Sequence, residues 1–340
     1  MSRPLRVFLG PAHVAGTLWN YQQGLRSIGV DAKVVLFYEH PFSYPADIEF
    51  KFMGNKYIRF LKRRLNCFIQ LPRLIHDFDV FHFVYGTSIL PYNFDVPILK
   101  LFRKKIVMHF VGSDIRPINL RDEHYDVNIW INKKKKIAEF WEKNADAIIS
   151  YPEQSQLLTK KYYVIPLGCD LEYWKPFTSN KFKKDRDKIL IIHAPSHRVV
   201  KGTKYVLKAI ESLKRDGYKI DFKLLEGVPN SEVREWLNIS DIVIDQFNGG
   251  YGCFATESMA LAKPTLGYIN KKWVKDLGYL RNKDIPIVNT TPDTIYDNLK
   301  LLIENPKLRR EIGAKSRKFV EEVHDSKKIA KQLLELYKSL

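Results

Sequence analysis

Short apolar runs alternate with amphipathic segments along the chain. An apolar run at residues 5–10 is followed by a helical pattern that ends at Gly29, and then by a second apolar run at residues 33–38. The apolar positions of the helical pattern share one helix face and are Leu18, Tyr21, Leu25 and Ile28. A strand, a helix and a strand within about 35 residues predict a βαβ unit and therefore a parallel sheet.

The second half of the chain repeats this order. An apolar run at residues 188–195 precedes a polar loop and an amphipathic helical pattern that ends at Gly217. Later apolar runs alternate with further helical patterns, at residues 221–226, 241–247, 264–269 and 286–289. The simplest architecture for this pattern is an α/β protein with two domains in tandem and a cleft between them.

A polar, linker-like stretch at residues 178–187 marks the passage between the two halves. We predict an N-terminal domain at residues 1–170 and a C-terminal domain at residues 171–322. The segment at residues 323–340 carries an apolar stripe at helical spacing, formed by Ile329, Leu333 and Leu336. We expect this segment to be a helix that packs back on the N-terminal domain.

Charge is the unusual part of the composition. The 340 residues include 56 Lys and Arg against 38 Asp and Glu, a net charge of +18. This excess indicates an anionic partner, either nucleic acid, anionic lipid or a phosphorylated substrate, although a solvated lysine-rich surface would also explain it. The 3 cysteines are too widely spaced to suggest a disulfide framework or a metal site, and no secretory segment is visible. We therefore expect a cytoplasmic protein, on the inner membrane face if its basic surface binds lipid.

Residues 56–72 predict a basic amphipathic helix. Apolar residues recur at helical spacing, and cations fill much of the remaining surface. The predicted membrane contacts among these cations are Lys56, Arg59, Arg63 and Arg64. Such a helix can lie on an anionic membrane surface, but a helix packed on its own sheet has the same pattern.

The stretch from Gly250 to Pro264 is the richest in candidate chemistry. It follows the apolar run at residues 241–247 and starts with a glycine-rich turn, which predicts a strand, a turn and a helix. The backbone at the helix start is the predicted phosphate contact, through Gly252, Cys253 and Phe254. One turn later, Glu257 is the only acid of the helix and can accept two hydroxyls of a ribose. The alternative is an ordinary strand–turn–helix packing unit.

Two cations and a further glycine complete the predicted diphosphate site. Arg198 and Lys201 follow the strand at residues 188–195, and Gly16 lies near the start of the first helix. Two cations beside helix N–H groups suit a diphosphate and can stabilise its departure without a metal ion. The sequence has neither a P-loop nor a dinucleotide glycine motif, and this argues against an NTPase or a dehydrogenase.

Polar residues also follow the apolar run at residues 104–110. The carboxyl ends of parallel strands are where α/β sheets bind ligands, so His109 is the candidate catalytic residue. Ser113, Asp114 and Arg116 follow it and are further candidate site residues, and either His109 or Asp114 could bind or deprotonate a hydroxyl. The alternative is that His109 is a packing residue.

Together these segments resemble the family-4 retaining glycosyltransferases, which have the GT-B fold. The likeness covers nearly the whole chain and is carried by residues 164–176 (hinge segment), 194–203 (diphosphate motif), 250–264 (donor motif) and 305–313 (C-terminal helix). It implies two Rossmann-like domains whose parallel sheets face each other across a cleft. It further implies a nucleotide-sugar donor in the C-terminal domain and an acceptor in the N-terminal domain, where the predicted acceptor-binding residues are Ser113, Asp114 and Arg116.

The resemblance implies a metal-independent transfer that uses a UDP- or GDP-sugar as co-substrate and no cofactor. Glu257 would bind the ribose, Arg198 and Lys201 the diphosphate, and His109 would lie near the transferred sugar while Gly16 faces the phosphates. The leaving phosphate would help to deprotonate the acceptor hydroxyl, with retention of anomeric configuration. The implied acceptor is a glycan or a polyprenyl-linked glycan, as in cell-surface polysaccharide synthesis, and no specific nucleic acid partner is expected.

The chain departs from the family pattern at two positions. Gly249 stands where the family usually has a glutamate that contacts the donor sugar, and Ser196 stands where it usually has the arginine. Arg198 would therefore have to reach the diphosphate from a shifted position. Two alternatives follow: a GT-B sugar-nucleotide epimerase or phosphorylase, and a non-catalytic basic adaptor that binds membrane or nucleic acid.

Overall fold

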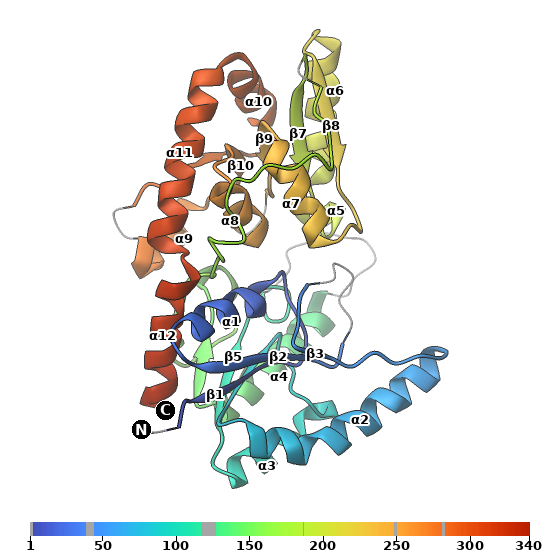
Figure 1. The fold of residues 1–340 in the computed structure, drawn as a ribbon, viewed down its shortest axis with the longest axis vertical. Helices are drawn as coiled ribbons and strands as arrows, with labels where there is room; N and C mark the ends of the chain where they lie inside the picture. The colour runs from blue at the N-terminus through green and yellow to red at the C-terminus, as the bar shows by residue number, and fades with distance from the viewer. Residues whose placement is uncertain (1–2, 39–43, 117–126, 186, 248–249, 281–282) are drawn as a thin grey trace. The chain divides into compact units, whose positions relative to one another are not determined.

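The computed structural model describes residues 3–38, 44–116, 127–185, 187–247, 250–280 and 283–340 (Figure 1). Gly249 lies outside these residues. The chain divides into two compact units. The first contains the chain up to Ile165 together with Lys327–Leu340, and the second contains Pro166–Ser326.

A parallel sheet of six strands forms the centre of the first unit, in the order β3-β2-β1-β4-β5-β6. The strands are β1 (Arg6–Gly10), β2 (Asp31–Leu36), β3 (Ile48–Glu49), β4 (Val80–Val84), β5 (Lys105–His109) and β6 (Ala147–Ile149). Every residue of β4 is buried. This is the burial expected of a central strand in a parallel sheet covered on both faces, and it explains why the apolar runs of the sequence are nearly continuous.

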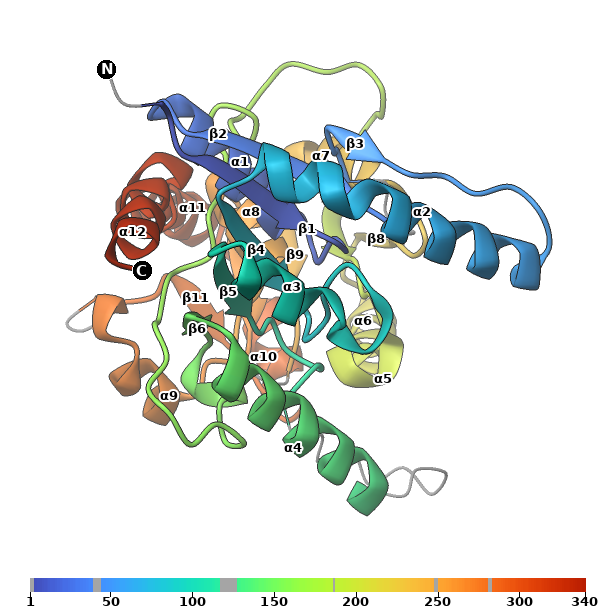
Figure 2. The same ribbon diagram turned by 90° about the horizontal axis from the view of Figure 1, so that it is seen from below.

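Helices cover both faces of this sheet (Figure 2). They are α1 (Thr17–Ser27), α2 (Lys56–Asp77), α3 (Asp95–Leu101), α4 (Val127–Asn144) and α12 (Ser326–Ser339), with short 3-10 turns at Pro91–Asn93 and Pro152–Gln154. Successive residues of β1 enter opposite cores, since Val7 and Leu9 pack with α1 and α12 while Phe8 packs with the end of α2, α3 and α4. The alternation follows from the two-residue period of a strand.

Helix α12 is an integral part of the first unit. Its buried apolar side chains include Ile329, Leu333 and Leu336. The hydroxyl of Tyr337 lies 2.6 Å from Nδ1 of His82 on β4, and Lys105 on β5 donates to the Tyr337 carbonyl at 2.8 Å.

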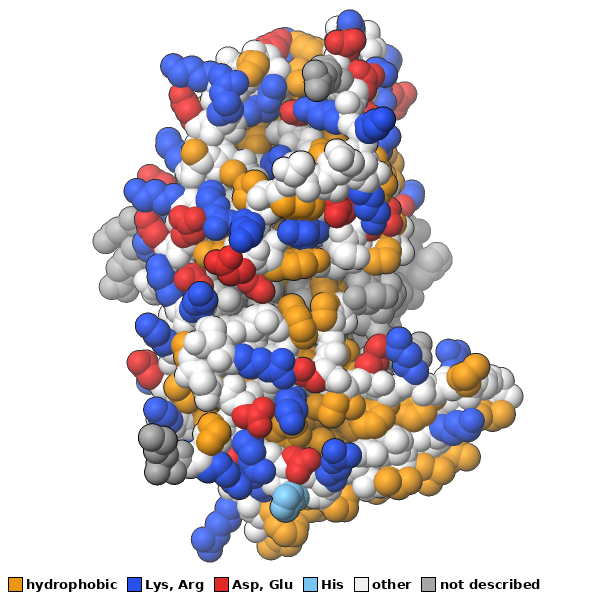
Figure 3. All heavy atoms as spheres, in the orientation of Figure 1, with side chains coloured by type: hydrophobic (Ala, Val, Ile, Leu, Met, Phe, Trp, Pro, Cys, Tyr) orange, Lys and Arg blue, Asp and Glu red, His pale blue; other side chains and the backbone are white. Residues whose placement is uncertain are grey.

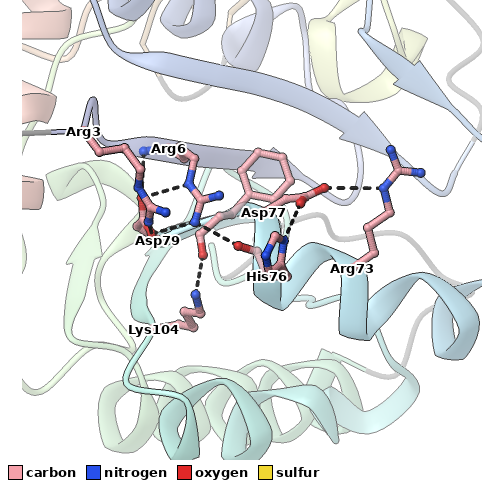
Figure 4. A network of polar contacts seen from close by, with 8 residues as sticks. Arg3, Arg6, Arg73, His76, Asp77, Asp79 and Lys104 are labelled. Atoms are coloured by element: carbon pink, nitrogen blue, oxygen red, sulfur yellow. Dashed lines mark hydrogen bonds and ion pairs between the residues drawn. The ribbon is translucent and has the colours of Figure 1, made fainter.

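A cluster of charges at the amino edge of the first sheet uses several of the chain's cations (Figure 4). Arg6 donates to both carboxylate oxygens of Asp79, and Arg3 pairs with the same carboxylate at 2.7 Å. Nearby on α2, Arg73 pairs with Asp77 at 3.4 Å. The pairs of Arg3 and Arg6 with Asp79 join β1 and the residues before it to the segment that connects α2 to β4, so part of the net positive charge serves the fold.

The second unit is built on a parallel sheet of five strands in the order β11-β10-β9-β7-β8. The strands are β7 (Ile189–His193), β8 (Ile220–Leu224), β9 (Ile242–Ile244), β10 (Thr265–Gly267) and β11 (Ile287–Asn289). The helices are α5 (Arg198–Lys201), α6 (Thr203–Arg215), α7 (Asn230–Ile239), α8 (Cys253–Ala260), α9 (Lys271–Asp276), α10 (Ile295–Glu304) and α11 (Pro306–Val323), with a 3-10 turn at Gly278–Leu280. The predicted α/β class with two parallel sheets is confirmed.

Helices α8 and α11 approach closely because α11 has a glycine at the contact. A Cβ atom added to Gly313 would lie 2.2 Å from the carbonyl oxygen of Ala262, just beyond the end of α8. Arg317, one turn further along α11, donates to the carbonyls of Ala260 and Trp174 at 2.8 and 2.9 Å. Together these contacts fix the helix that carries Glu257.

Candidate functional site

The loop after β7 carries the two cations predicted to bind a diphosphate. Arg198 begins the short helix α5, and its guanidinium donates twice to the carboxylate of Glu226, at 2.8 and 2.5 Å. The pair is open to water, since the Arg198 side chain is 59% exposed. Arg198 therefore already has an anionic partner on the loop after β8, which the sequence did not predict.

Lys201 lies at the other end of α5 and reaches the glycine turn. Its ammonium group donates to Oε1 of Gln246, and the Gln246 amide donates to the carbonyl of Gly250. The buried carboxylate of Asp245 accepts a hydrogen bond from the N–H of Gly252 at 3.3 Å. The end of β9 thus brings Lys201 and the start of α8 to one place.

Helix α8 begins at this turn without a capping side chain. Gly252 occupies the N-cap with extended backbone, and Cys253 is the first helical residue. Gly250 has φ +78, a left-handed conformation that favours glycine. Since the first N–H groups of a helix have no intrahelical acceptor, this end offers donors and a positive dipole beside the turn that Lys201 contacts through Gln246.

Glu257 lies one turn into α8 and is buried. Among the residues that the structure describes, no cation pairs with its side chain, and the amide of Asn230 at the start of α7 donates to it over a long 3.5 Å. Burial raises the pKa of Glu257 to about 8, and the nearby charge of Asp245 adds to the rise. At neutral pH this carboxyl group is therefore largely protonated in the protein without ligand.

In the first unit, Gly16 and His109 lie at the carboxyl edge of the sheet. Gly16 is the N-cap of α1 with φ 72, and His109 is the last residue of β5. The His109 ring is fully buried between aromatic neighbours, 5.9 Å from Tyr21 and 5.6 Å from His82 between ring centres. Neither ring nitrogen has a hydrogen-bond partner among the residues that the structure describes. Burial, together with the neighbouring His82, lowers the pKa of His109 well below its usual value, so the imidazole is neutral.

In the loop after His109, the side chain of Asp114 bonds to the backbone of its own turn, although its sequence position suggested a ligand contact. The carboxylate of Asp114 accepts hydrogen bonds from the N–H groups of Val111, Gly112 and Ile115 at 2.8–3.1 Å. Asp114 therefore stabilises its own turn. Ser113 is exposed and its hydroxyl lies 2.8 Å from that of Tyr85.

Arg116 is half-buried at the end of the same turn. Its carbonyl accepts a hydrogen bond from Lys134 at 2.7 Å, and its N–H donates to the carbonyl of Gly112 at 2.9 Å. Its positive charge lowers the pKa of Glu153, although burial has the larger effect and raises that pKa overall. Arg116 is thus a positive charge near the carboxyl edge of the first sheet.

The four predicted membrane contacts lie on α2. Lys56 and Arg59 are exposed, whereas Arg63 and Arg64 are half-buried and lie over aromatic rings. Apolar side chains of α2 are also exposed, and Figure 3 shows apolar side chains gathered over this helix at the lower right. Only the end of α2 is buried, through Cys67, Leu71, Leu74 and Ile75. Within the parts of the chain that the structure describes, no helix is long and apolar enough to cross a membrane.

Four residues of the second unit's site were not predicted: Glu226, Asn230, Asp245 and Gln246. Asp245 and Gln246 end the apolar run at residues 241–247, and polar residues at the carboxyl end of a predicted parallel strand were an available signal. The partner of Arg198 comes from the loop after β8 and that of Glu257 from the start of α7, and the sequence held no signal for either. Among the described residues, no group of three or more His, Cys, Asp and Glu is placed to hold a metal ion.

No protein-family model matches the sequence, and a search of curated proteins found no match. Solved structures do resemble the chain in fold. HepE of Anabaena in complex with UDP-glucose aligns with a TM-score of 0.65 at 13% identity, over 99% of this chain and 100% of that one. Sucrose-phosphate synthase from Thermosynechococcus elongatus aligns with a TM-score of 0.64 at 14% identity, over 99% of each chain. The chain therefore shares the GT-B fold of these glycosyltransferases.

The same fold is also found in a protein to which another activity has been assigned. A protein designated a UDP-N-acetylglucosamine 2-epimerase, from Listeria monocytogenes, aligns with a TM-score of 0.57 at 11% identity over 99% of this chain and 96% of that one. The fold alone thus leaves both sugar transfer and epimerisation open, and the residues of the site have to decide between them.

Proposed function

We propose that the chain is a retaining, metal-independent glycosyltransferase of the family-4 type, which moves a sugar from a UDP- or GDP-sugar to a hydroxyl of a glycan or lipid-linked glycan. HepE, a protein of similar fold, is known in complexes with UDP and with UDP-glucose. In this chain, the convergence of Lys201, the start of α8 and Glu257 supports a nucleotide-sugar site in the second unit.

Each group has a defined task in this proposal. Lys201 and the first N–H groups of α8 bind the diphosphate, and Glu257 accepts the two ribose hydroxyls. The bond between the anomeric carbon and the diphosphate oxygen breaks, and a bond to the acceptor oxygen forms on the same face. The acceptor proton passes to the departing phosphate, whose negative charge Lys201 and the helix dipole stabilise.

Arg198 and the first-unit residues take supporting roles. Arg198 contacts the diphosphate once it exchanges the Glu226 carboxylate for a phosphate oxygen, because the ion pair is exposed and readily rearranged. His109, which is neutral, is the residue proposed to hydrogen-bond the transferred sugar, and Gly16 to face the phosphates. Ser113 and Arg116 are proposed acceptor contacts; Asp114 would support them by holding their turn.

One observation carries the proposal: Glu257 is buried one turn from the start of α8, and within the described part of the chain it has no cationic partner and a single long hydrogen bond. A buried carboxyl group with unused acceptor capacity is destabilising, and hydroxyl donors from a ligand would satisfy it. A ribose placed next to a diphosphate provides two such donors.

The test is a thermal-shift screen of the wild type and Glu257→Ala against UDP, GDP, ADP and their common sugar conjugates. A ligand at 100 times its Kd stabilises the folded state by about 2.7 kcal/mol, which is readily measured. We expect one nucleotide series to stabilise the wild type and to lose most of this effect in Glu257→Ala. If no nucleotide shifts the transition, the donor site does not exist and the non-catalytic adaptor becomes the better hypothesis.

Epimerisation is the second candidate, and the Listeria fold relative motivates it. Incubation with the stabilising nucleotide sugar, followed by proton NMR of the sugar ring, separates the two activities. A transferase releases the nucleoside diphosphate only when an acceptor or water takes the sugar, whereas an epimerase inverts a ring carbon without an acceptor.

We also propose that α2 places the protein on an anionic membrane surface. The helix combines exposed apolar side chains with Lys56, Arg59, Arg63 and Arg64, as interfacial helices do. Reversal of the charges of Arg59, Arg63 and Arg64 should abolish sedimentation with vesicles that contain anionic lipid. Full sedimentation of this variant would refute membrane contact through α2.

A further inference from the structure

A pocket opens between the first half of α2 and the segment that follows β2. Its volume is about 540 Å³, and it is lined by Phe37, Tyr38, Phe50, Phe52, Lys56, Tyr57, Arg59, Phe60 and Arg63. A second hollow of about 250 Å³ shares Tyr38, Phe60 and Arg63 with the first. Arg63 thus stands where the two hollows meet.

The lining combines aromatic walls with positive charge. Six of the nine residues that line the larger pocket are aromatic, three are cationic, and none is acidic. The guanidinium of Arg63 lies over the Tyr38 ring at 4.6 Å and near the Phe60 ring at 5.9 Å. Among the described residues, none of the three cations forms an ion pair with a carboxylate. The positive charge is therefore available to a ligand.

We infer that this pocket binds the phosphate-bearing head of a single lipid molecule. Arg59, Arg63 and Lys56 match a phosphate in charge, and Arg can donate to it with two parallel hydrogen bonds. The aromatic walls match the first part of an aliphatic chain, because apolar contact is what these rings offer. A water-soluble phosphate would use the cations but leave the aromatic walls unoccupied.

The surroundings of the pocket supply a path for such a lipid. Beyond the pocket, α2 continues with exposed apolar side chains: Leu61 is 59% exposed, Leu65 54% and Ile69 70%. A helix with this surface can lie in the membrane interface, so a lipid chain can enter the pocket from the bilayer without crossing water.

The pocket also lies at the carboxyl edge of the first sheet. Phe37 and Tyr38 follow β2 directly, and the N–H of Phe37 donates to the carbonyl of Pro11, just beyond β1, at 2.9 Å. Gly16 and His109 belong to the same edge, where α/β sheets bind ligands. In the transferase proposed above, the lipid in this pocket would be the carrier of the acceptor sugar, and this last assignment rests on the proposed function.

The test measures lipid binding by calorimetry on the full chain, with dihexanoyl phosphatidic acid kept below its micelle-forming concentration. Arg59→Gln/Arg63→Gln removes two charges that line the pocket. Lys62→Gln/Arg73→Gln is the control and removes two charges from the same helix. Neither residue lines the pocket or the second hollow; Lys62 is exposed, and Arg73 pairs with Asp77. We expect the first variant to weaken binding at least tenfold and the second less than threefold. If the first variant does not fold, Arg59→Gln alone serves, because Arg59 is exposed.

Three outcomes would overturn the inference. Equal weakening in both variants would mean that the lipid responds only to the total charge of α2. Equal affinity for dihexanoyl phosphatidylcholine would remove the role of an anionic head, and equal affinity for inorganic phosphate would remove the role of the aliphatic chain. The experiment needs no nucleotide, so its result is independent of the Glu257→Ala screen. Once transfer is measured, Arg59→Gln/Arg63→Gln should raise the KM for the lipid acceptor and leave that for the nucleotide sugar unchanged.

Discussion

Glu257 provides a prediction that connects folding to function. The buried carboxyl group has a pKa of about 8 in the folded chain, against 4.5 for an ordinary glutamate, chiefly because burial disfavours its charged form. Glu257→Gln replaces it with a neutral group of the same shape that carries no such penalty. We therefore expect the variant without ligand to be more stable than the wild type, while its nucleotide binding is weaker.

The magnitude follows from proton linkage. The folded-state pKa is the raised one, so the stability associated with this group is fully present below pH 4.5 and is lost as the pH rises toward 8. At pH 7 the unfolded glutamate is ionised while the folded one is largely protonated. Since pH 7 lies about 2.5 units above the unfolded-state pKa of 4.5, and each unit is worth about 1.36 kcal/mol, keeping this group protonated costs the folded wild type about 3 kcal/mol of unfolding free energy. At pH 5 the same reasoning gives about 1 kcal/mol.

The assay is urea denaturation monitored by pulsed hydrogen exchange. Peptides from β9 and α8 report on the unfolding of the second unit alone. The advantage of Glu257→Gln over the wild type should grow from about 1 kcal/mol at pH 5 to about 3 kcal/mol at pH 7. Glu211→Gln, on the exposed face of α6, serves as the control and should show no such growth. An advantage that is independent of pH, or a variant less stable than the wild type at pH 7, would refute the reasoning.

Three further predictions concern the same unit. Lys201→Met should weaken binding of the stabilising nucleoside diphosphate by about tenfold to a hundredfold, the range for a charge-assisted hydrogen bond, and should leave binding of the nucleoside unchanged; equal losses for both would contradict a phosphate role. Glu226→Gln should tighten diphosphate binding in calorimetry, because Arg198 is released from its carboxylate partner, and weaker binding would show that the pair acts as a unit. Gly313→Ala should destabilise the second unit by roughly 1–3 kcal/mol in the same urea assay, because the new Cβ meets the Ala262 carbonyl, and a gain in stability would show that α8 and α11 can separate without cost.

The elements that the sequence predicted well are those determined by local pattern. Continuous apolar runs became the buried strands of two parallel sheets, and the glycine-rich turn before Glu257 became the start of α8. Partners across long stretches of chain were not predictable. Arg198 was predicted to bind a diphosphate from its place in the loop after a strand, but only the fold brings Glu226, 28 residues away, to its side chain. Asp114 shows the converse, since its polar character suggested a ligand contact while the nearest N–H groups of its own turn engage the carboxylate.

The first unit is assembled from both ends of the chain, and this has a consequence for synthesis. The second unit is formed by the continuous stretch Pro166–Ser326, which precedes α12 in the chain. The ribosome therefore completes the second unit before α12 emerges. Until α12 is made, the face of the first sheet that Ile329, Leu333 and Tyr337 cover stays open. We therefore expect the first unit to expose part of its apolar core during translation until α12 has been made, which is after the second unit can fold.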